Sequence, residues 1–200
     1  MKDTITLPMD RVEIHHIALW MPNWIGDVIL ALPSLQNLRI RYPNARITAI
    51  ARTPSDELLS VCRDLDSIIQ FPSNREDGYI NQFNYAYGLR KYRFDLGIVF
   101  PNSIHSAMML FLAGARFRLG YSTEGRRIFL THPIPVTRKE KKTSYRVDYY
   151  HKILSPLNLG SVPDHYDPMW RKRNKVKLEN TLLKVGLDKN SFFVTVHPGT

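Results

Sequence analysis

The sequence has little cysteine and no long hydrophobic run, and each absence excludes a class of protein. Cys62 is the single cysteine among 200 residues, so an intramolecular disulfide framework is excluded. It lies in an apolar helical segment, which predicts a packed core thiol. The longest apolar run, residues 107–114, is too short to cross a bilayer. The first residues lack an apolar core, so we expect no secretory signal and a cytoplasmic protein.

Common signatures of bound cofactors and metals are also missing. Neither the GxxxxGK[ST] nor the GxGxxG phosphate-binding pattern occurs. The seven histidines are scattered, and only His15 and His16 are adjacent. Adjacent residues of a strand point to opposite faces, so this pair does not make a ligand cluster. We therefore expect no bound metal and no resident cofactor.

The chain carries few acidic residues relative to its basic ones. Lysine and arginine total 28 against 18 aspartates and glutamates, which gives a formal net charge of +10. Such a charge favours anionic partners, namely nucleic acid, phosphorylated lipid headgroups or acidic sugars. A solvated surface explains any single basic run equally well. No standard nucleic-acid-binding motif accompanies the charge, so nucleic acid is not the expected partner.

Short apolar runs alternate with amphipathic segments through most of the chain. The runs predict strands at residues 14–20, 46–51, 67–71, 94–100 and 117–121. The intervening segments predict helices at residues 28–41, 54–62, 78–93 and 104–113. Strands joined by helical crossovers pair in parallel, so we predict an α/β fold with a doubly wound parallel sheet. After residue 121 we expect an irregular or extended connection at 127–136, helices at 145–157 and 175–185, and a strand at 192–196.

The loop that follows the first predicted strand ends in a single carboxylate, Asp27. The carboxyl edge of an open parallel sheet is where such folds build their sites. Gly26 permits a tight turn there, and Asp27 would lie at or near the N-cap of the next helix. Asp27 is therefore either a functional carboxylate or only a helix cap.

Two further loops follow predicted strands at the same edge. One contains Asn102 and Ser103, which would bind a ligand or, for Ser103, cap the next helix. The other contains Arg126 and Arg127, which would clamp an anion or remain as solvated surface charges. Because parallel strands project these loops to one side, their polar groups should converge.

Four ordered motifs together make the sequence resemble the lipopolysaccharide heptosyltransferase family, glycosyltransferase family 9. They are Pro22-Asn23-Trp24-Ile25-Gly26-Asp27, Pro101-Asn102-Ser103, Gly120-Tyr121 with Glu124-Gly125-Arg126, and His197-Pro198-Gly199. The proline-asparagine-tryptophan before the glycine-aspartate pair is most similar to the heptosyltransferase II branch. The resemblance implies the Rossmann-like N-terminal half of a GT-B glycosyltransferase, followed by only the start of a second domain.

The resemblance also implies a reaction. The family transfers L-glycero-D-manno-heptose from ADP-heptose, its donor substrate, to heptosyl-Kdo2-lipid A with inversion. Asp27 matches the aspartate of the family motif and would act as the general base. Asn23, Trp24, Gly26, Asn102, Ser103, Arg126 and Arg127 would lie on the acceptor side. Trp24 would either stack on a sugar ring or pack under its loop. The phosphorylated lipid A–Kdo acceptor implies peripheral contact with the inner face of the inner membrane.

The last motif suggests where a second domain would begin. We expect an acceptor-side domain over residues 1–160, with residues 161–200 forming a linker and the start of a donor-binding domain. His197, Gly199 and Thr200 would face the donor, although an isolated histidine is also commonly structural. The chain would then be a truncated transferase lacking most of its donor site. The alternative is an inactive acceptor-binding or vestigial fragment of such an enzyme.

Overall fold

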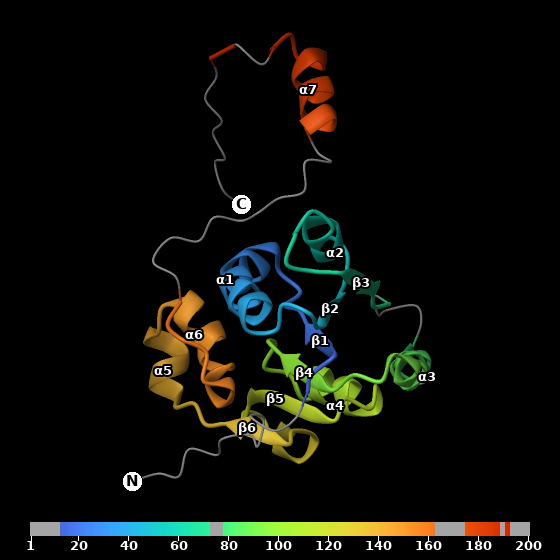
Figure 1. Ribbon diagram of the computed structural model, residues 1–200, viewed down its shortest axis with the longest axis vertical. Coiled ribbons are helices and arrows are strands. Elements are labelled where there is room, and N and C mark those ends of the chain that lie inside the picture. Colours follow the sequence, from blue (N-terminus) through green and yellow to red (C-terminus); the bar gives the residue numbers. More distant parts are fainter. Residues whose placement is uncertain (1–12, 73–77, 163–174, 189–190, 193–200) are drawn as a thin grey trace.

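A computed structural model describes residues 13–72, 78–162, 175–188 and 191–192, and shows six parallel strands with helices on both sides (Figure 1). The strands are β1 (His16–Trp20), β2 (Arg46–Ala51), β3 (Ser67–Gln70), β4 (Leu96–Val99), β5 (Phe117–Tyr121) and β6 (His132–Ile134). The α-helices are α1 (Ile25–Arg41), α2 (Ser55–Leu59), α3 (Gly78–Gly88), α4 (Ile104–Leu112), α5 (Arg138–Thr143), α6 (Arg146–Lys152) and α7 (Lys175–Lys184). Short 3₁₀ helices are η2 (Leu89–Tyr92), η3 (Arg126–Phe129) and η4 (Ser155–Leu157).

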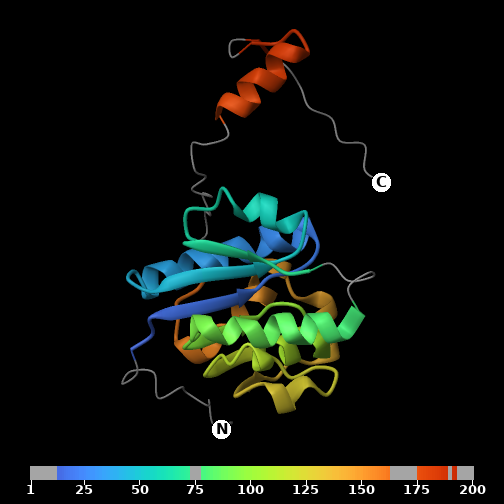
Figure 2. The same cartoon turned by 90° about the vertical axis from the view of Figure 1, so that its right-hand side faces the viewer.

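The sheet is buried on both faces, which is why its strands are almost continuously apolar. Ile17 and Leu19 of β1 point into a core shared with α1, α2 and α6. Ala18 and Trp20 point into the opposite core, shared with α3 and α4. Figure 2 shows the strands nearly side-on, with α3 and α4 in front. The predicted doubly wound α/β fold is confirmed.

The strand order is β3-β2-β1-β4-β5-β6. The chain builds outward from β1 to β3, then returns to the other side of β1 and builds outward again. The order therefore reverses between β1 and β4, and the loops leaving these two strands diverge. Open α/β sheets bind ligands in the crevice at such a reversal.

Two predicted boundaries were wrong in ways that bear on the site. Helix α1 begins at Ile25, three residues before the predicted start, so Asp27 lies in its first turn. The N-cap is Trp24, not Asp27. The connection after β5, predicted as irregular or extended, contains η3 and a short extended strand, β6, whose parallel pairing with β5 was not predicted. Pro133 lies within β6, opposite Gly120.

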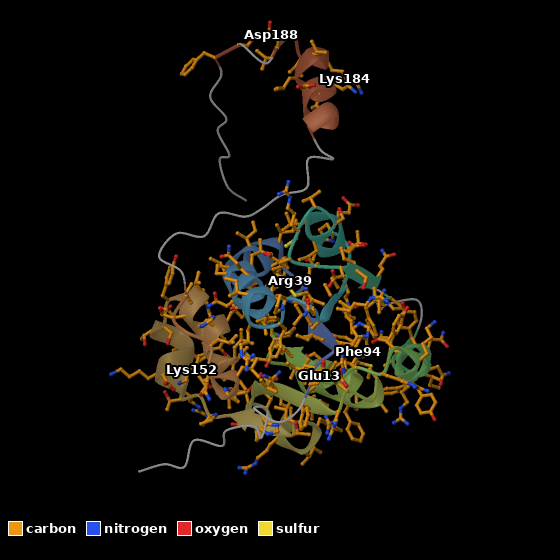
Figure 3. The ribbon with its side chains drawn as sticks, viewed as in Figure 1. Glu13, Arg39, Phe94, Lys152, Lys184 and Asp188 are labelled. Atoms are coloured by element: carbon orange, nitrogen blue, oxygen red, sulfur yellow. The ribbon has the colours of Figure 1, made fainter. Side chains whose placement is uncertain are left out.

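Helix α5 was missed altogether, since its sequence was interpreted only as a basic run. Thr137 caps it by accepting the Glu140 N–H, and the Glu140 carboxylate accepts the Thr137 N–H in return. This reciprocal capping box starts the helix despite its dense positive charge. Glu140 also forms a salt bridge with Lys152 of α6 at 2.5 Å, and Figure 3 shows Lys152 beside α5 and α6.

Other features agree with the sequence-based expectations. Cys62 is buried in the core beside α1 and α2. In the part of the chain that the structure describes, no helix is both long and apolar enough to cross a membrane. Helix α7 lies apart from the sheet in both views (Figures 1 and 2).

Candidate functional site at the reversal point of the sheet

The loop after β1 presents its polar and aromatic groups to solvent. Trp24 is 78% exposed, and Asn23 is exposed beside it. Trp24 is therefore not packed under its loop. Nothing lies within 4 Å of the position that a Cβ on Gly26 would occupy, so open space surrounds this turn. The start of α1 has no side-chain cap, which leaves its first N–H groups available for an anion or a hydroxyl oxygen.

Asp27 sits in the first turn of α1 and is part-buried. The hydroxyl of Tyr150, from α6, forms a hydrogen bond with its carboxylate, and burial together with this acidic neighbour raises the pKa of Tyr150. With its pKa raised, the Tyr150 hydroxyl is protonated at neutral pH and donates to Asp27. Its ring packs edge-on against Phe100, which follows β4. The carboxylate is thus held by a rigid donor.

The loop after β4 is attached to the same helix. The Asn102 side chain and the Tyr149 hydroxyl lie 2.8–3.1 Å apart in a side-chain hydrogen bond. Tyr149 and Tyr150 are consecutive on α6, so one helix contacts both sides of the reversal point. Ser103 is the N-cap of α4 and accepts the Ser106 N–H at 3.2 Å. The capping interpretation of Ser103 is confirmed, although its side chain remains exposed.

Arg126 lies fully buried beneath the loops that follow β4 and β5. Its Nε donates to the Tyr121 carbonyl at 2.5 Å, and its Nη1 donates to the Pro101 carbonyl. Burial lowers the pKa of Arg126 to about 10, despite the opposing effects of Tyr149 and Glu124. Its Nη2 is buried without a hydrogen-bond partner among the residues that the structure describes. Arg126 therefore ties two site loops together.

Arg127 differs from its neighbour because its side chain is exposed. The adjacent Ile128 is 77% exposed, so η3 presents a basic and an apolar side chain together. Beneath η3, Tyr121 donates to the Tyr149 carbonyl at 2.5 Å, and the two rings lie 4.5 Å apart. This aromatic pair supports the loops from below.

The structure thus brings most of the predicted site residues to one edge of the sheet. Asn23, Trp24, Gly26 and Asp27 stand on the β1 side, and Asn102, Ser103, Arg126 and Arg127 on the β4–β5 side. His197, Gly199 and Thr200 lie outside the described residues. No group of three or more histidine, cysteine, aspartate or glutamate side chains arranged for a metal occurs within the described ranges.

Sequence reasoning assigned no role to three tyrosines that support this edge, Tyr121, which stands in one of the motifs, and Tyr149 and Tyr150, which stand in none. The signal for the last two was present in the sequence, since α6 reads Arg-Val-Asp-Tyr-Tyr-His-Lys within a predicted helix. Two consecutive tyrosines at the buried face of a helix carry hydroxyls that need partners. Their partners, Asn102 and Asp27, are distant in sequence, so the sequence alone did not pair them.

Comparison with known proteins gives a consistent result. Residues 83–181 match the family described as glycosyltransferase family 9 (heptosyltransferase). Lipopolysaccharide heptosyltransferase 2 of Escherichia coli is 32% identical over 120 residues, covering 60% of this chain and 34% of that protein. Lipooligosaccharide heptosyltransferase 2 of Haemophilus influenzae is 31% identical over 110 residues, covering 54% of this chain and 32% of that protein.

A solved structure shares the fold. The structure of Escherichia coli ADP-heptose LPS heptosyltransferase II superposes with a TM-score of 0.67 at 22% identity. The superposition covers 88% of this chain and 52% of that one. The matches therefore span about a third of the curated relatives and about half of the solved chain.

Proposed function

This chain carries a glycosyltransferase family 9 domain and is homologous to lipopolysaccharide heptosyltransferase 2, and from that premise we propose that it forms the acceptor-binding half of an inverting heptosyltransferase. The observation that carries the proposal is the position of Asp27. A carboxylate stands at the carboxyl edge of the sheet beside the reversal point, in the first turn of a helix with an uncapped N-terminus.

The proposed reaction is a single displacement. L-glycero-D-manno-heptose passes from ADP-heptose to a hydroxyl of heptosyl-Kdo2-lipid A, with inversion at the anomeric carbon. The Asp27 carboxylate removes the hydroxyl proton while the oxygen bonds to the anomeric carbon, and the bond to ADP breaks on the opposite face. The hydrogen bond from Tyr150 orients the carboxylate, and the N-terminus of α1 stabilises its charge.

The acceptor would lie across both sides of the reversal point. The exposed face of Trp24 is available to stack on a sugar ring, with Asn23 in the loop and Gly26 leaving open space at the first turn of α1. Arg127 is exposed and suited to bind an acceptor phosphate or Kdo carboxylate. Asn102 and Ser103 offer polar groups on the opposite side. Arg126 contributes by holding their loop, because its guanidinium is buried against backbone carbonyls.

The chain spans about half the length of the solved relative. We propose that residues 1–160 form the acceptor-side domain and that residues 161–200 lead into the donor-binding domain. His197, Gly199 and Thr200 would then contact ADP-heptose, with no metal taking part. The reaction would take place at the cytoplasmic face of the inner membrane, where the lipid acceptor is presented.

A mass-spectrometric transfer assay with ADP-heptose and heptosyl-Kdo2-lipid A tests the proposal. It compares the chain as it stands, the chain extended by a family-type second half, and extended forms carrying Asp27→Ala or Asp148→Ala. Asp148 is an exposed carboxylate of α6 and serves as the matched control. We expect transfer only in extended forms, reduced about 10²–10⁴-fold by Asp27→Ala and little changed by Asp148→Ala.

The outcomes separate the claims. Full transfer by the chain alone would refute the assignment of the donor site to a second half. Equal transfer by the Asp27→Ala form would refute the general base. Absence of transfer in every extended form would refute the substrates and leave the inactive acceptor-binding fragment as the better description.

A further inference from the structure

The opposite, amino-terminal edge of the sheet carries an open pocket of about 510 Å³ between β4 and β5. The residues around it are Arg90, Arg93, Phe94, Asp95, Gly114 and Arg116. They precede the two strands, so the pocket lies at the far end of β4 and β5 from Asn102 and Arg126. Phe94, labelled in Figure 3, is the apolar side chain among them. Nothing in the proposed transfer reaction uses this pocket.

The charges around the pocket do not cancel. Three arginines and one aspartate, Asp95, line it, which gives a formal charge of +2. The Asp95 carboxylate is already bound to backbone, because its Oδ2 accepts the His15 and His16 N–H groups at 2.8 and 2.9 Å. Within the described ranges, none of the three arginines forms an ion pair with a carboxylate. The pocket therefore attracts an anion.

Two of the arginines are held in place by contacts that leave N–H donors free. Arg90 donates from Nε to the Leu112 carbonyl at 2.9 Å, and its guanidinium carbon lies 4.5 Å from the centre of the Tyr87 ring. Arg116 lies over the Phe117 ring at 5.0 Å. Stacking occupies the face of a guanidinium, while its donors point outward in the plane. Such donors suit the oxygen atoms of a phosphate.

A glycine makes room for this arrangement. Gly114 has a left-handed backbone, with φ of +75°, and a Cβ at this position would lie 3.1 Å from Cγ of Arg90. The Arg90 stem therefore crosses the loop where a larger residue would displace it. Arg93 is exposed and adds a third donor from the end of η2.

We propose that this pocket, defined by Arg90, Arg93 and Arg116, binds a phosphate group. The phosphate belongs either to a soluble phosphate monoester or to a lipid headgroup that is itself a phosphomonoester, since both present the same tetrahedral anion. The site is separate from the transfer site, and its test does not depend on transfer activity.

The test is a titration of the chain with inorganic pyrophosphate at constant ionic strength, followed by backbone amide NMR. We expect saturable shifts at Arg93, Asp95 and Arg116, and weaker shifts at Trp24 and Asn102. The double variant Arg93→Gln/Arg116→Gln should raise Kd about tenfold or more, because two charge-assisted contacts are lost. Arg63→Gln is the matched control, since Arg63 is exposed and lies before β3, outside the pocket.

A second arm identifies the source of the phosphate. Vesicles of zwitterionic lipid with and without phosphatidic acid are sedimented with the chain and with both variants. Binding to phosphatidic acid that depends on Arg93 and Arg116 indicates a lipid headgroup, and binding to pyrophosphate alone indicates a soluble ester. The proposal is overturned if no saturable shift occurs at the pocket, or if Arg63→Gln weakens binding as much as the double variant. Amide spectra of the free variants establish that each remains folded.

Discussion

The two sides of the reversal point are built in opposite ways. On the β1 side, Trp24 is 78% exposed and the helix start lacks a side-chain cap. On the β4–β5 side, Arg126 is fully buried and bonds two backbone carbonyls, while Asn102 is bonded to Tyr149. The β1 loop leaves the N–H groups at the start of α1 without a side-chain cap. The β4–β5 side uses most of its polar groups for hydrogen bonds within the protein. Helix α6 contacts both, so a ligand would meet an open loop against a rigid wall.

On the β4–β5 side, replacing Arg126 should cause the largest loss of stability. Arg126→Met removes the donors of the Pro101 and Tyr121 carbonyls, and we expect the free energy of unfolding to fall by about 2–3 kcal/mol. Arg126→Lys should recover part of this loss, since one ammonium reaches fewer acceptors. Urea denaturation measures both variants. Arg127→Met, at the exposed neighbour, should stay within about 0.5 kcal/mol of the parent. Equal effects of the two Met variants would contradict the difference between the neighbours.

A smaller loss of stability should follow when the hydrogen bond between Tyr149 of α6 and Asn102 of the loop after β4 is removed. Tyr149→Phe leaves the part-buried Asn102 amide without its hydroxyl partner, at a cost of about 1–2 kcal/mol. Tyr145→Phe is the control, because Tyr145 is 68% exposed on the same segment. Thermal unfolding compares the two. If Tyr145→Phe cost as much as Tyr149→Phe, the hydrogen bond to Asn102 would not be what supports the loop.

Acidification should destabilise the fold beneath both sides. Burial lowers the pKa of His16, His105 and His132. Below about pH 6.5 the unfolded chain binds more protons than the folded one at these sites. The free energy of unfolding therefore decreases as the pH is lowered, until the pH drops below the lowered folded pKa values. His16→Gln should flatten this dependence relative to the exposed His15→Gln control. Urea midpoints from pH 8 downward provide the measurement, and identical slopes would contradict the assignment.

The smallest effect on stability should come from the open side. Trp24→Ala removes a large side chain that is mostly in water, so the free energy of unfolding should change by less than about 0.5 kcal/mol. Transfer by the extended protein should nevertheless fall about tenfold, since an aromatic stacking surface for the acceptor is lost. Loss of stability without loss of transfer would show that Trp24 is structural.

Much of the fold could be predicted from the sequence because the sheet is parallel. Strands buried on both faces are apolar throughout, and the bounds of β2 and β5 were predicted without error. The short strand β6 was missed because it contains a proline and only three residues. The capping box at Thr137 and Glu140 was a readable helix signal that the surrounding lysines and arginines obscured.

The candidate site was less predictable, for a physical reason. Loop positions follow from strand ends, so the convergence of Asp27 with Asn102 could be foreseen. The burial of Arg126 could not, because its partners are backbone carbonyls that carry no side-chain signal. The same limit concealed Tyr150, whose contact with Asp27 depends on how α6 packs against α1.

Pro133 in β6 has a consequence for the molecule in a concentrated solution. Proline has no N–H, so a further strand cannot pair regularly with this outermost one. At the other edge of the sheet, the Tyr85 hydroxyl donates a hydrogen bond to the Gln70 carbonyl of β3. Each edge strand thus carries a feature that disfavours pairing with a strand of another chain. Such pairing is how exposed sheet edges begin to aggregate.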